Sequence, residues 1–568
     1  ETDDLVLHDS EIDVKLRSEE TKITTTNTAE FEWPEFIIAA NDIDLAQNTF
    51  SYSINGKQQS TESFNPNAFK IEQLQLLAQN LEYRPEQFNL DVSKFSFSEP
   101  NGIHLNQLAF KAGLNNTKAS LSDVVFQINN SSANADLNVQ FNSLKDALEN
   151  PEKSTLTANI ADLNLELGDL LNIQPELAQN QYLDSLSKHP FTGHLKARGN
   201  LRKVDDLSTE IQWGPDTHLV AKGSIENLTQ TDSLFYNLNN ISFKSNKTAI
   251  DKLISSKELG ISVPKTIVAE GSLSGGTSWV KPNMVLKIPE GNANINALVD
   301  FGEIMKFDGT VSIDSLQLGQ LLQNDQLGEI SLQINANGSG NETSNLDANI
   351  TGNISQFQYG GYSYKAIDID GILNNGKGNI SANINDPNLN MDAGATLLLT
   401  SNDNDIQFTS NIIGADLKEL GLTKENIKVA ANINGDYTGI PSNFTINTVI
   451  DDGIAVADNE QYQVSTIILK AHVEDTITVV SVQSNFLNGQ LASNASPNRI
   501  TNALKKQLEH YFSTDDTVYE VEDTIEAKLA IAIIPTPVLS KVFFNGVEDL
   551  DSLNIDASFD SKKRKAPT

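Results

Sequence analysis

The sequence predicts an all-β fold built as an antiparallel meander, because alternation of apolar and polar residues recurs between short turns. Asn375-Gly376 is the strongest turn signal, since both central positions of a two-residue hairpin must accept positive φ. Closing that hairpin places Ile369 opposite Ala382 and Ile367 opposite Ile384. These four side chains therefore share one face of the sheet.

Two further turns agree with this register. Gly360-Gly361 places Ile354 opposite Ile367. The loop from Gly338 to Ser344 joins two more strands whose apolar residues fall on the same face of the sheet. The turns predict an apolar face, here called the lining, that contains Leu332, Ile334, Ala336, Leu346, Ala348, Ile350, Ile354, Ile367, Ile369, Ile380, Ala382 and Ile384. The opposite face carries polar residues: Ser331, Gln333, Asn335, Asp347, Asn349 and Thr351.

Strict alternation places four aromatic residues of the same region on the face opposite the lining: Phe357, Tyr359, Tyr362 and Tyr364. A β-bulge sets two residues of one strand against one of its neighbour, which changes the face of every residue beyond it. The sequence therefore leaves two alternatives. Either a bulge lies near Gln356, or the rings pack on the outer face.

The chain divides into one long β region and a short C-terminal part. Residues 1–495 are expected to form a continuous β-groove, and residues 513–568 to hold strands, a short helix and a basic tail. Residues 496–512 form an amphipathic pattern with Pro497 in the first turn, which predicts a helix. This helix is a lid, a partner-docking helix, or a helix packed on the end of the sheet. Further short helices are expected near 143–149, 168–188, 248–259, 318–324 and 415–421.

A strand–helix–strand unit recurs with a Leu-x-Leu-Gly-like signature. It appears at Leu163–Leu171, Ser315–Leu322 and Ala415–Gly421, each flanked by alternating strands. The spacing between the copies is unequal, which argues against a solenoid of fixed period. The units predict a sheet interrupted at intervals by helical insertions at its rim.

The composition excludes several classes of function. A net charge of −35 over 568 residues argues against nucleic-acid binding and against docking on anionic lipid headgroups. The chain has no Cys, so it has neither disulfides nor a thiolate metal site, which suits an extracytoplasmic protein. No signal peptide and no apolar run of about 18 residues is present, so any anchor is expected outside this segment.

An apolar face of this length must be covered, because burying each Leu or Ile contributes about 1.5–3 kcal/mol. The sheet can split into sandwiches, coil into a solenoid, or fold lengthwise into a trough for an apolar ligand. Small inward residues such as Ala336, Ala348 and Ala382 leave room in the interior. Trough and sandwich are about equally favoured by these observations, and the solenoid less so.

The chain resembles the TamB branch of the AsmA-like (bridge-like lipid-transfer) superfamily. The recurring unit carries this resemblance, together with the segments Tyr359–Gly371, Asn379–Leu389, Leu219–Leu228 and Gly260–Pro264. The resemblance implies a long antiparallel sheet folded lengthwise into a U-shaped hydrophobic groove, a β-taco, with a few short helical insertions. It also implies that the lining binds phospholipid acyl chains.

The resemblance further implies a place in the cell and a set of partners. The full-length protein would be anchored in the inner membrane, cross the periplasm of a diderm bacterium and support outer-membrane biogenesis beside a BamA-like barrel or other envelope proteins. Two alternatives stay open. One is a β-rich extracellular or periplasmic scaffold or adhesin, and the other is a platform that assists outer-membrane protein assembly.

No motif predicts an enzyme, a metal site or a cofactor. Gly371–Gly378 lacks the hydroxyl of a P-loop, and Asp386–Asp392 lacks the glycine of a calcium loop. Gly271–Gly275 has Leu273 where a hydrolase carries its nucleophile. His189, His194 and His218 have no metal-ligand spacing and are expected at the surface or rim of the sheet.

Overall fold

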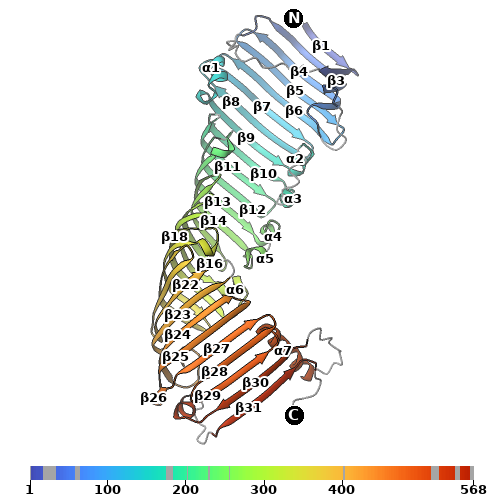
Figure 1. Cartoon of the computed structure of the whole chain (residues 1–568). Helices are drawn as coiled ribbons and strands as arrows, with labels where there is room; N and C mark the ends of the chain where they lie inside the picture. Colours follow the sequence, from blue (N-terminus) through green and yellow to red (C-terminus); the bar gives the residue numbers. More distant parts are fainter. Residues whose placement is uncertain are drawn as a thin grey trace. The chain divides into compact units, whose positions relative to one another are not determined.

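The computed structural model describes residues 2–16, 33–57, 64–173, 183–200, 202–227, 230–254, 256–400, 403–512, 524–543 and 551–562. The all-β prediction is confirmed, since thirty-one strands and only short helices occur among these residues (Figure 1). The chain forms two compact units, residues 1–289 and 290–568, called here unit 1 and unit 2. Each unit is described by itself, and a single continuous groove over residues 1–495 stays a prediction.

Unit 1 is a sheet of fifteen strands among its described residues. The strands are β1 (Thr2–His8), β2 (Glu11–Leu16), β3 (Ile38–Ile54), β4 (Ala68–Arg84), β5 (Gln87–Glu99), β6 (Ile103–Asn115), β7 (Lys118–Ile128), β8 (Ser131–Gln140), β9 (Thr155–Leu165), β10 (Phe191–Gly199), β11 (Lys203–Trp213), β12 (Thr217–Glu226), β13 (Phe235–Asn246), β14 (Thr266–Gly276) and β15 (Trp279–Ile288). Its helices are α1 (Leu144–Glu149), η1 (Pro151–Lys153), α2 (Leu167–Ile173), α3 (Leu183–Leu186), η3 (Thr231–Ser233), α4 (Lys247–Ile250) and α5 (Ser256–Leu259).

Unit 2 is a second run of strands with the same meander order. The strands are β16 (Gly291–Asp300), β17 (Lys306–Gln317), β18 (Leu327–Ser339), β19 (Asp347–Tyr359), β20 (Tyr362–Asn374), β21 (Lys377–Asp386), β22 (Leu389–Leu399), β23 (Asn404–Asp416), β24 (Ile427–Ile440), β25 (Asn443–Ala457), β26 (Glu460–Val464), β27 (Ile467–Glu474), β28 (Ile477–Gln483), β29 (Leu487–Ser493), β30 (Glu526–Ile533) and β31 (Leu553–Asp560). Its helices are α6 (Leu318–Leu322), η4 (Thr343–Asn345), α7 (Pro497–Phe512) and η5 (Leu539–Phe543).

The predicted registers are confirmed. Ile369 pairs with Ala382 and Ile367 with Ile384 across β20 and β21, and Ile354 pairs with Ile367 across β19 and β20. The turn between β20 and β21 has positive φ at both central residues, 49° at Asn375 and 72° at Gly376. Two exceptions to the antiparallel meander occur among the described strands. At the N-terminal edge of unit 1, β1 and β2 both pair with β3 in parallel. In unit 2, β25 pairs with both β26 and β27.

The bulge near Gln356 is also confirmed. Ser331 of β18 faces Gln356 while Leu332 faces Ile354, so Ser355 is the extra residue. Ala366, on the neighbouring strand, has a φ of 50°. The aromatic residues beyond the bulge therefore share the lining face, and the rings of Tyr362 and Tyr364 lie edge to face with centroids 4.8 Å apart.

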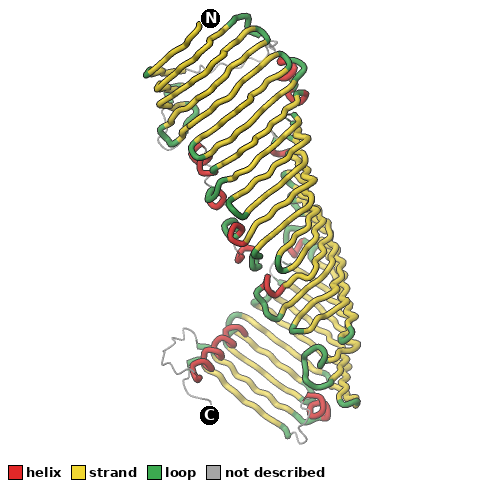
Figure 2. Tube along the Cα trace, turned by 180° about the vertical axis from the view of Figure 1, so that it is seen from behind, coloured by secondary structure: helices red, strands yellow, loops and turns green. Residues whose placement is uncertain are grey.

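Bulges recur along both units and bend the strands. Several coincide with residues of positive φ, including Asn80, Asp123, Ser315 and Asp452. An extra residue on one strand increases its local twist and bends it, which is how an open sheet is made to curve. The strands of each unit curve accordingly (Figure 2).

Most of the predicted helices are present, and one is wrong. Helices α1, α2, α3, α4, α5 and α6 fall in the ranges expected, although residues 174–182 lie outside the described residues. The expected helix at 415–421 is a single turn instead. The Gly421 amide donates to the carbonyl of Lys418 and the Leu422 amide to that of Leu417, with a φ of 74° at Gly421. This Schellman pattern ends the helix at its first turn.

The C-terminal predictions are partly confirmed. Residues 497–512 form α7, and Ile500 of this helix is buried against Ala495, Ile525 and Ala527. The helix is therefore packed on the end of its own sheet. The short helix expected within residues 513–568 is the π-helix η5. Of the basic tail at 562–565, only Lys562 lies within the described residues.

Candidate functional site

The lining of unit 1 is a set of apolar rows, where a row joins the residues that face one another in successive strands. One row crosses β3 to β15 through Leu45, Leu76, Phe95, Leu108, Phe126, Ala133, Leu163, Gly193, Ile211, Leu219, Phe243, Ala269 and Leu286. A second crosses β5 to β15 through Leu90, Ala112, Leu121, Leu137, Ala158, Ala197, Leu207, Gly223, Leu238, Leu273 and Pro282. No polar side chain interrupts either row.

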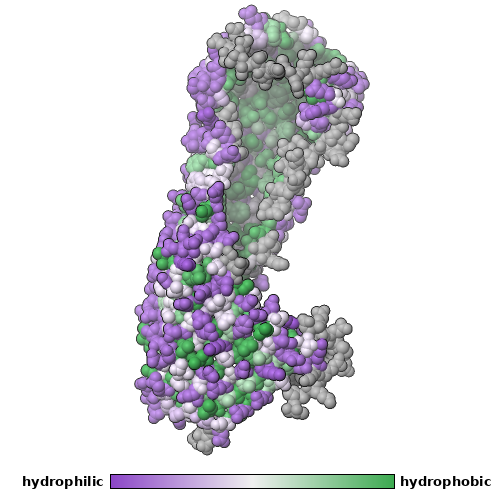
Figure 3. All heavy atoms as spheres, viewed as in Figure 1, coloured by the Kyte–Doolittle hydropathy of each residue, from purple (hydrophilic) through white to green (hydrophobic). Residues whose placement is uncertain are grey.

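The apolar face of unit 1 is hollowed, and hydrophobic side chains gather in the hollow (Figure 3). A cavity of about 540 Å³ opens in unit 1, lined by Trp33, Pro34, Phe36, Ile38, Leu81, Tyr83, Phe88, Leu114, Leu144 and Leu148. The Tyr83 hydroxyl donates to the carbonyl of Pro34 at 3.0 Å, and the Phe36 ring lies 4.9 Å from the Tyr83 ring. The cavity is therefore an apolar recess whose one phenol is already hydrogen-bonded.

The lining of unit 2 contains the residues that the sequence predicted. Ile334, Ile369 and Ala382 lie in one row, from Ile295 and Val311 to Ile450 and Ile467, which is apolar except at Ser410. The next two rows contain Ala336, Ile350 and Ile380, and Leu332, Ile354, Ile367 and Ile384. Ala348 lies in a fourth row with Gly338 and Leu373, and Leu346 immediately precedes β19.

The predicted residues are covered only in part. Ala348 and Ile367 are buried and most of the others are half-buried, while Ile380 is 37% exposed. Their strand neighbours on the other face, including Gln333, Asn335 and Asn349, are exposed. The lining of unit 2 is thus a partly covered face, opposite an exposed polar face.

Glycines on the lining were not predicted from the sequence. Gly352 lies between Ile334 and Ile369, and Gly371 between Ile350 and Ile380. A Cβ on Gly352 would lie 3.2 Å from Ile334 Cγ1, so the isoleucine already occupies that space. Their signal is the same period-two alternation, because each glycine falls at an inward position between two branched residues.

The outer face is held by amide–carboxylate pairs between adjacent strands. The amide of Asn353 donates to Asp368 at 2.8 Å, that of Asn383 to Asp392 at 2.5 Å, and that of Asn432 to Asp452 at 3.0 Å. Asn134 and Asp162 form the same pair in unit 1. An amide neutralises no charge, so this arrangement keeps the outer face acidic and hydrated.

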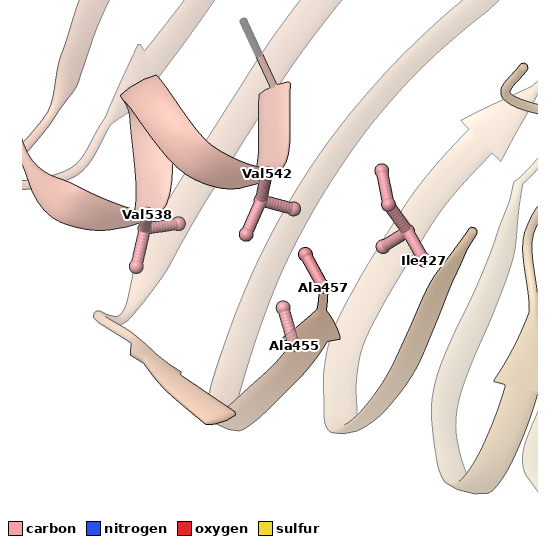
Figure 4. Close-up of a cluster of buried hydrophobic side chains, with 5 residues drawn as sticks. All are labelled: Ile427, Ala455, Ala457, Val538 and Val542. Atoms are coloured by element: carbon pink, nitrogen blue, oxygen red, sulfur yellow. The ribbon is translucent and has the colours of Figure 1, made fainter. Parts of the chain in front are cut away.

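At the C-terminal end of unit 2 the chain covers its own lining. Val538 and Val542, of the segment that contains η5, pack on Ile427, Ala455 and Ala457 at the ends of β24 and β25 (Figure 4). Ala455 is only 1% exposed. A second cluster forms under α7, where Leu491 and Phe559 pack against the buried residues. Ligand space is therefore reduced at this end.

Asp386, at the start of the calcium-loop-like segment, has a structural role. Its carboxylate accepts hydrogen bonds from the Tyr362 hydroxyl at 2.5 Å and from the amides of Lys365 and Asn388 at 3.0 and 2.9 Å. Burial, and then the hydrogen bond to Asp386, raise the pKa of Tyr362 to about 12. Within the described ranges no group of three or more acidic, His or Cys side chains is arranged to hold a metal ion.

Comparisons with protein-family models and with curated proteins find no match for this chain. Among the residues that the structure describes, no helix combines the length and hydropathy needed to cross a bilayer. The resemblance to the TamB branch therefore stays a prediction, and the arguments for function come from the lining.

Proposed function

We propose that this chain is a segment of a lipid-transfer protein of the cell envelope. In this proposal the lining shields the acyl chains of phospholipid while the lipid moves between the inner and outer membranes. Supporting outer-membrane biogenesis, the periplasmic location, the inner-membrane anchor and the BamA-like partner are parts of the proposal that depend on the TamB resemblance alone.

One observation supports the proposal most strongly: the apolar rows continue from strand to strand while their side chains stay only half covered. In a sandwich the same positions would be buried by a second sheet. Transfer of an acyl chain out of water is favourable by about 0.8 kcal/mol per CH₂ group, so exposed rows of this kind attract lipid tails.

The uniformity of the rows suits movement as well as binding. Most steps along the sheet replace one set of apolar contacts with another, so the free energy of a bound chain changes little between most neighbouring strands. Transport along such a surface requires no catalytic side chain. The half-covered lining also accounts for the small inward residues, which leave space that larger side chains would fill.

Extraction of lipid from vesicles tests the proposal. Delipidated protein is mixed with phosphatidylglycerol vesicles that carry a fluorescent phospholipid, and the lipid bound to protein is measured. We expect Ile334→Asp to reduce extraction at least tenfold, because a carboxylate then stands in the lining. Asn335→Asp, one residue away on the outer face, is the matched control and should leave extraction unchanged.

The result also separates the alternatives. Failure of the unmodified protein to extract lipid would contradict transfer and favour a β scaffold whose lining packs against other protein. Crosslinks to unfolded outer-membrane barrel proteins in the absence of lipid extraction would favour an assembly platform that offers sheet edges.

A further inference from the structure

A basic pair lies at the rim of unit 1, where α3, the ends of β10 and β11, and α4 meet. His189 Nε2 and Lys252 Nζ are 2.7 Å apart. Lys252 Nζ lies 5.9 Å from the ring centroid of Trp213, and the His189 ring meets that indole edge-on at 5.6 Å. Residues 63 positions apart in sequence are thus brought together over one aromatic surface.

The basic pair has no acidic partner among the described residues, unlike the basic groups beside it. Lys188 pairs with Asp184, Lys247 with Asp251, and His218 with Glu210, at 3.5, 3.0 and 2.8 Å. The chain has 75 acidic residues against 40 Lys and Arg, so a carboxylate partner is the common outcome. Lys252 donates one hydrogen bond to His189 Nε2 and has no carboxylate partner in the described part of the chain, so its two other N–H groups are available to an anion.

Trp213 connects the basic pair to the lining. It lies two residues after Ile211, which belongs to the first row of unit 1, and it faces Phe191 across the ladder. The indole is 4% exposed, and its Nε1 donates to the carbonyl of Leu186 at 2.8 Å, which fixes the ring. The nitrogens of His189 and Lys252 are therefore held at the boundary between apolar lining and solvent.

We propose that His189 and Lys252 form a phosphate-binding site at this rim. A phosphate oxygen accepts hydrogen bonds from the two N–H groups of Lys252 that His189 does not use, while His189 Nε2 accepts the third and holds the ammonium in place. Charge-assisted bonds of this kind are about twice as strong as neutral ones. The net charge of −35 opposes broad adsorption to an anionic surface. It does not oppose a single phosphate held at one local pair.

The site rests on the proposed lipid function when the phosphate belongs to a lipid, because the acyl chains then lie on the lining next to Ile211. A free phosphate has the same oxygen chemistry and would need no lining. The experiment therefore compares three probes: fluorescent phosphatidylglycerol, fluorescent diacylglycerol with the same chains, and inorganic phosphate.

Binding of each probe is measured for the full chain and for Lys252→Gln, His189→Gln and Lys252→Arg. We expect Lys252→Gln to weaken phosphatidylglycerol binding about tenfold and His189→Gln to weaken it less, because His189 only positions the ammonium. Diacylglycerol binding should be unchanged, and Lys252→Arg should bind like the unmodified protein. Lys247→Gln, in the adjoining helix α4 and paired with Asp251, is the matched control. Trp213 emission, observed in a Trp33→Phe/Trp279→Phe background, shows that each variant is folded.

The outcomes distinguish the phosphate-binding site from the proposed lipid function. Equal binding of both lipids, unchanged by Lys252→Gln, would overturn the rim site and leave the lipid function standing. Binding of inorganic phosphate that requires Lys252, without binding of either lipid, would support the site and overturn its link to lipid. Binding of none of the three probes would overturn both proposals.

Discussion

Two regions of unit 2 share the same apolar lining but differ in what covers it. Across β18 to β21, the side chains of Ile334, Ile350 and Ile384 are half-buried. At the ends of β24 and β25, Ile427 and Ala455 are buried beneath Val538 and Val542. The strand pattern is the same in both regions. A short C-terminal segment, and not the sheet, therefore decides where space for a ligand exists.

The largest expected effect compares a charge placed in these two regions. Ala455→Asp puts a carboxylate among buried apolar groups without a partner, and we expect it to lower the free energy of unfolding by about 3–5 kcal/mol. Ile334→Asp, in the half-covered region, should cost about 1–2 kcal/mol, since its carboxylate can stay hydrated. Urea unfolding of both variants gives the two values. Equal losses of unfolding free energy in the two variants would contradict the claim that Ala455 is covered and Ile334 is only half covered.

A smaller effect on stability is expected beside the bulge in the half-covered region, at Tyr362. Tyr362→Phe removes the hydroxyl that donates to Asp386, a carboxylate only 5% exposed, and should cost about 1.5–3 kcal/mol. The measurement is urea unfolding at pH 7. Tyr359→Phe, on the preceding strand and 49% exposed, is the control and should change stability little.

The same tyrosine predicts how stability depends on pH. Its pKa is raised in the folded protein to about 12, so its contribution is complete below pH 10, the ordinary value, and is lost as the pH rises through 12. The difference between the tyrosinate absorbance titrations of the unmodified protein and Tyr362→Phe should be one group that titrates near 12. If the group missing in Tyr362→Phe titrates near 10 instead, the raised pKa of this phenol is contradicted.

The smallest effect concerns the outer face, which both regions share. Asn353→Asp sets a carboxylate directly opposite Asp368, and like charges at facing positions cost about 0.2–1 kcal/mol. The loss should shrink in high salt because the pair is exposed. Urea midpoints at low and high ionic strength measure it, and a loss independent of salt would contradict the electrostatic explanation.

The register of unit 2 was predictable because the turns carry strong local signals. Asn375-Gly376 requires a tight hairpin, and the alternation around it then assigns every neighbouring side chain to a face. The sequence permits the bulge at Ser355 only as one of two alternatives, since neither Ser355 nor Ala366 has a side chain that requires it. Ala366 adopts its positive φ because the paired strands hold it there.

The helices were less predictable than the strands. The pattern at 415–421 matches a helix in composition, but Gly421 adopts a positive φ and ends the helix after one turn. A glycine at this position is a helix stop signal, which the helix prediction did not take into account. Helix α7 was predicted as an element, but its amphipathic pattern could not choose among lid, docking and packing roles. That choice depends on Ile525 and Ala527, which lie beyond the helix in sequence and pack against Ile500.

In the proposed function, one face of the sheet contacts lipid and the other face contacts water. A photoreactive amino acid at position 350 or at position 349, followed by irradiation with phosphatidylglycerol vesicles, tests it most directly. These neighbours differ only in the face they occupy. The account predicts crosslinked phospholipid at position 350 and little or none at position 349. Equal crosslinking at both positions, or none at position 350, would contradict it.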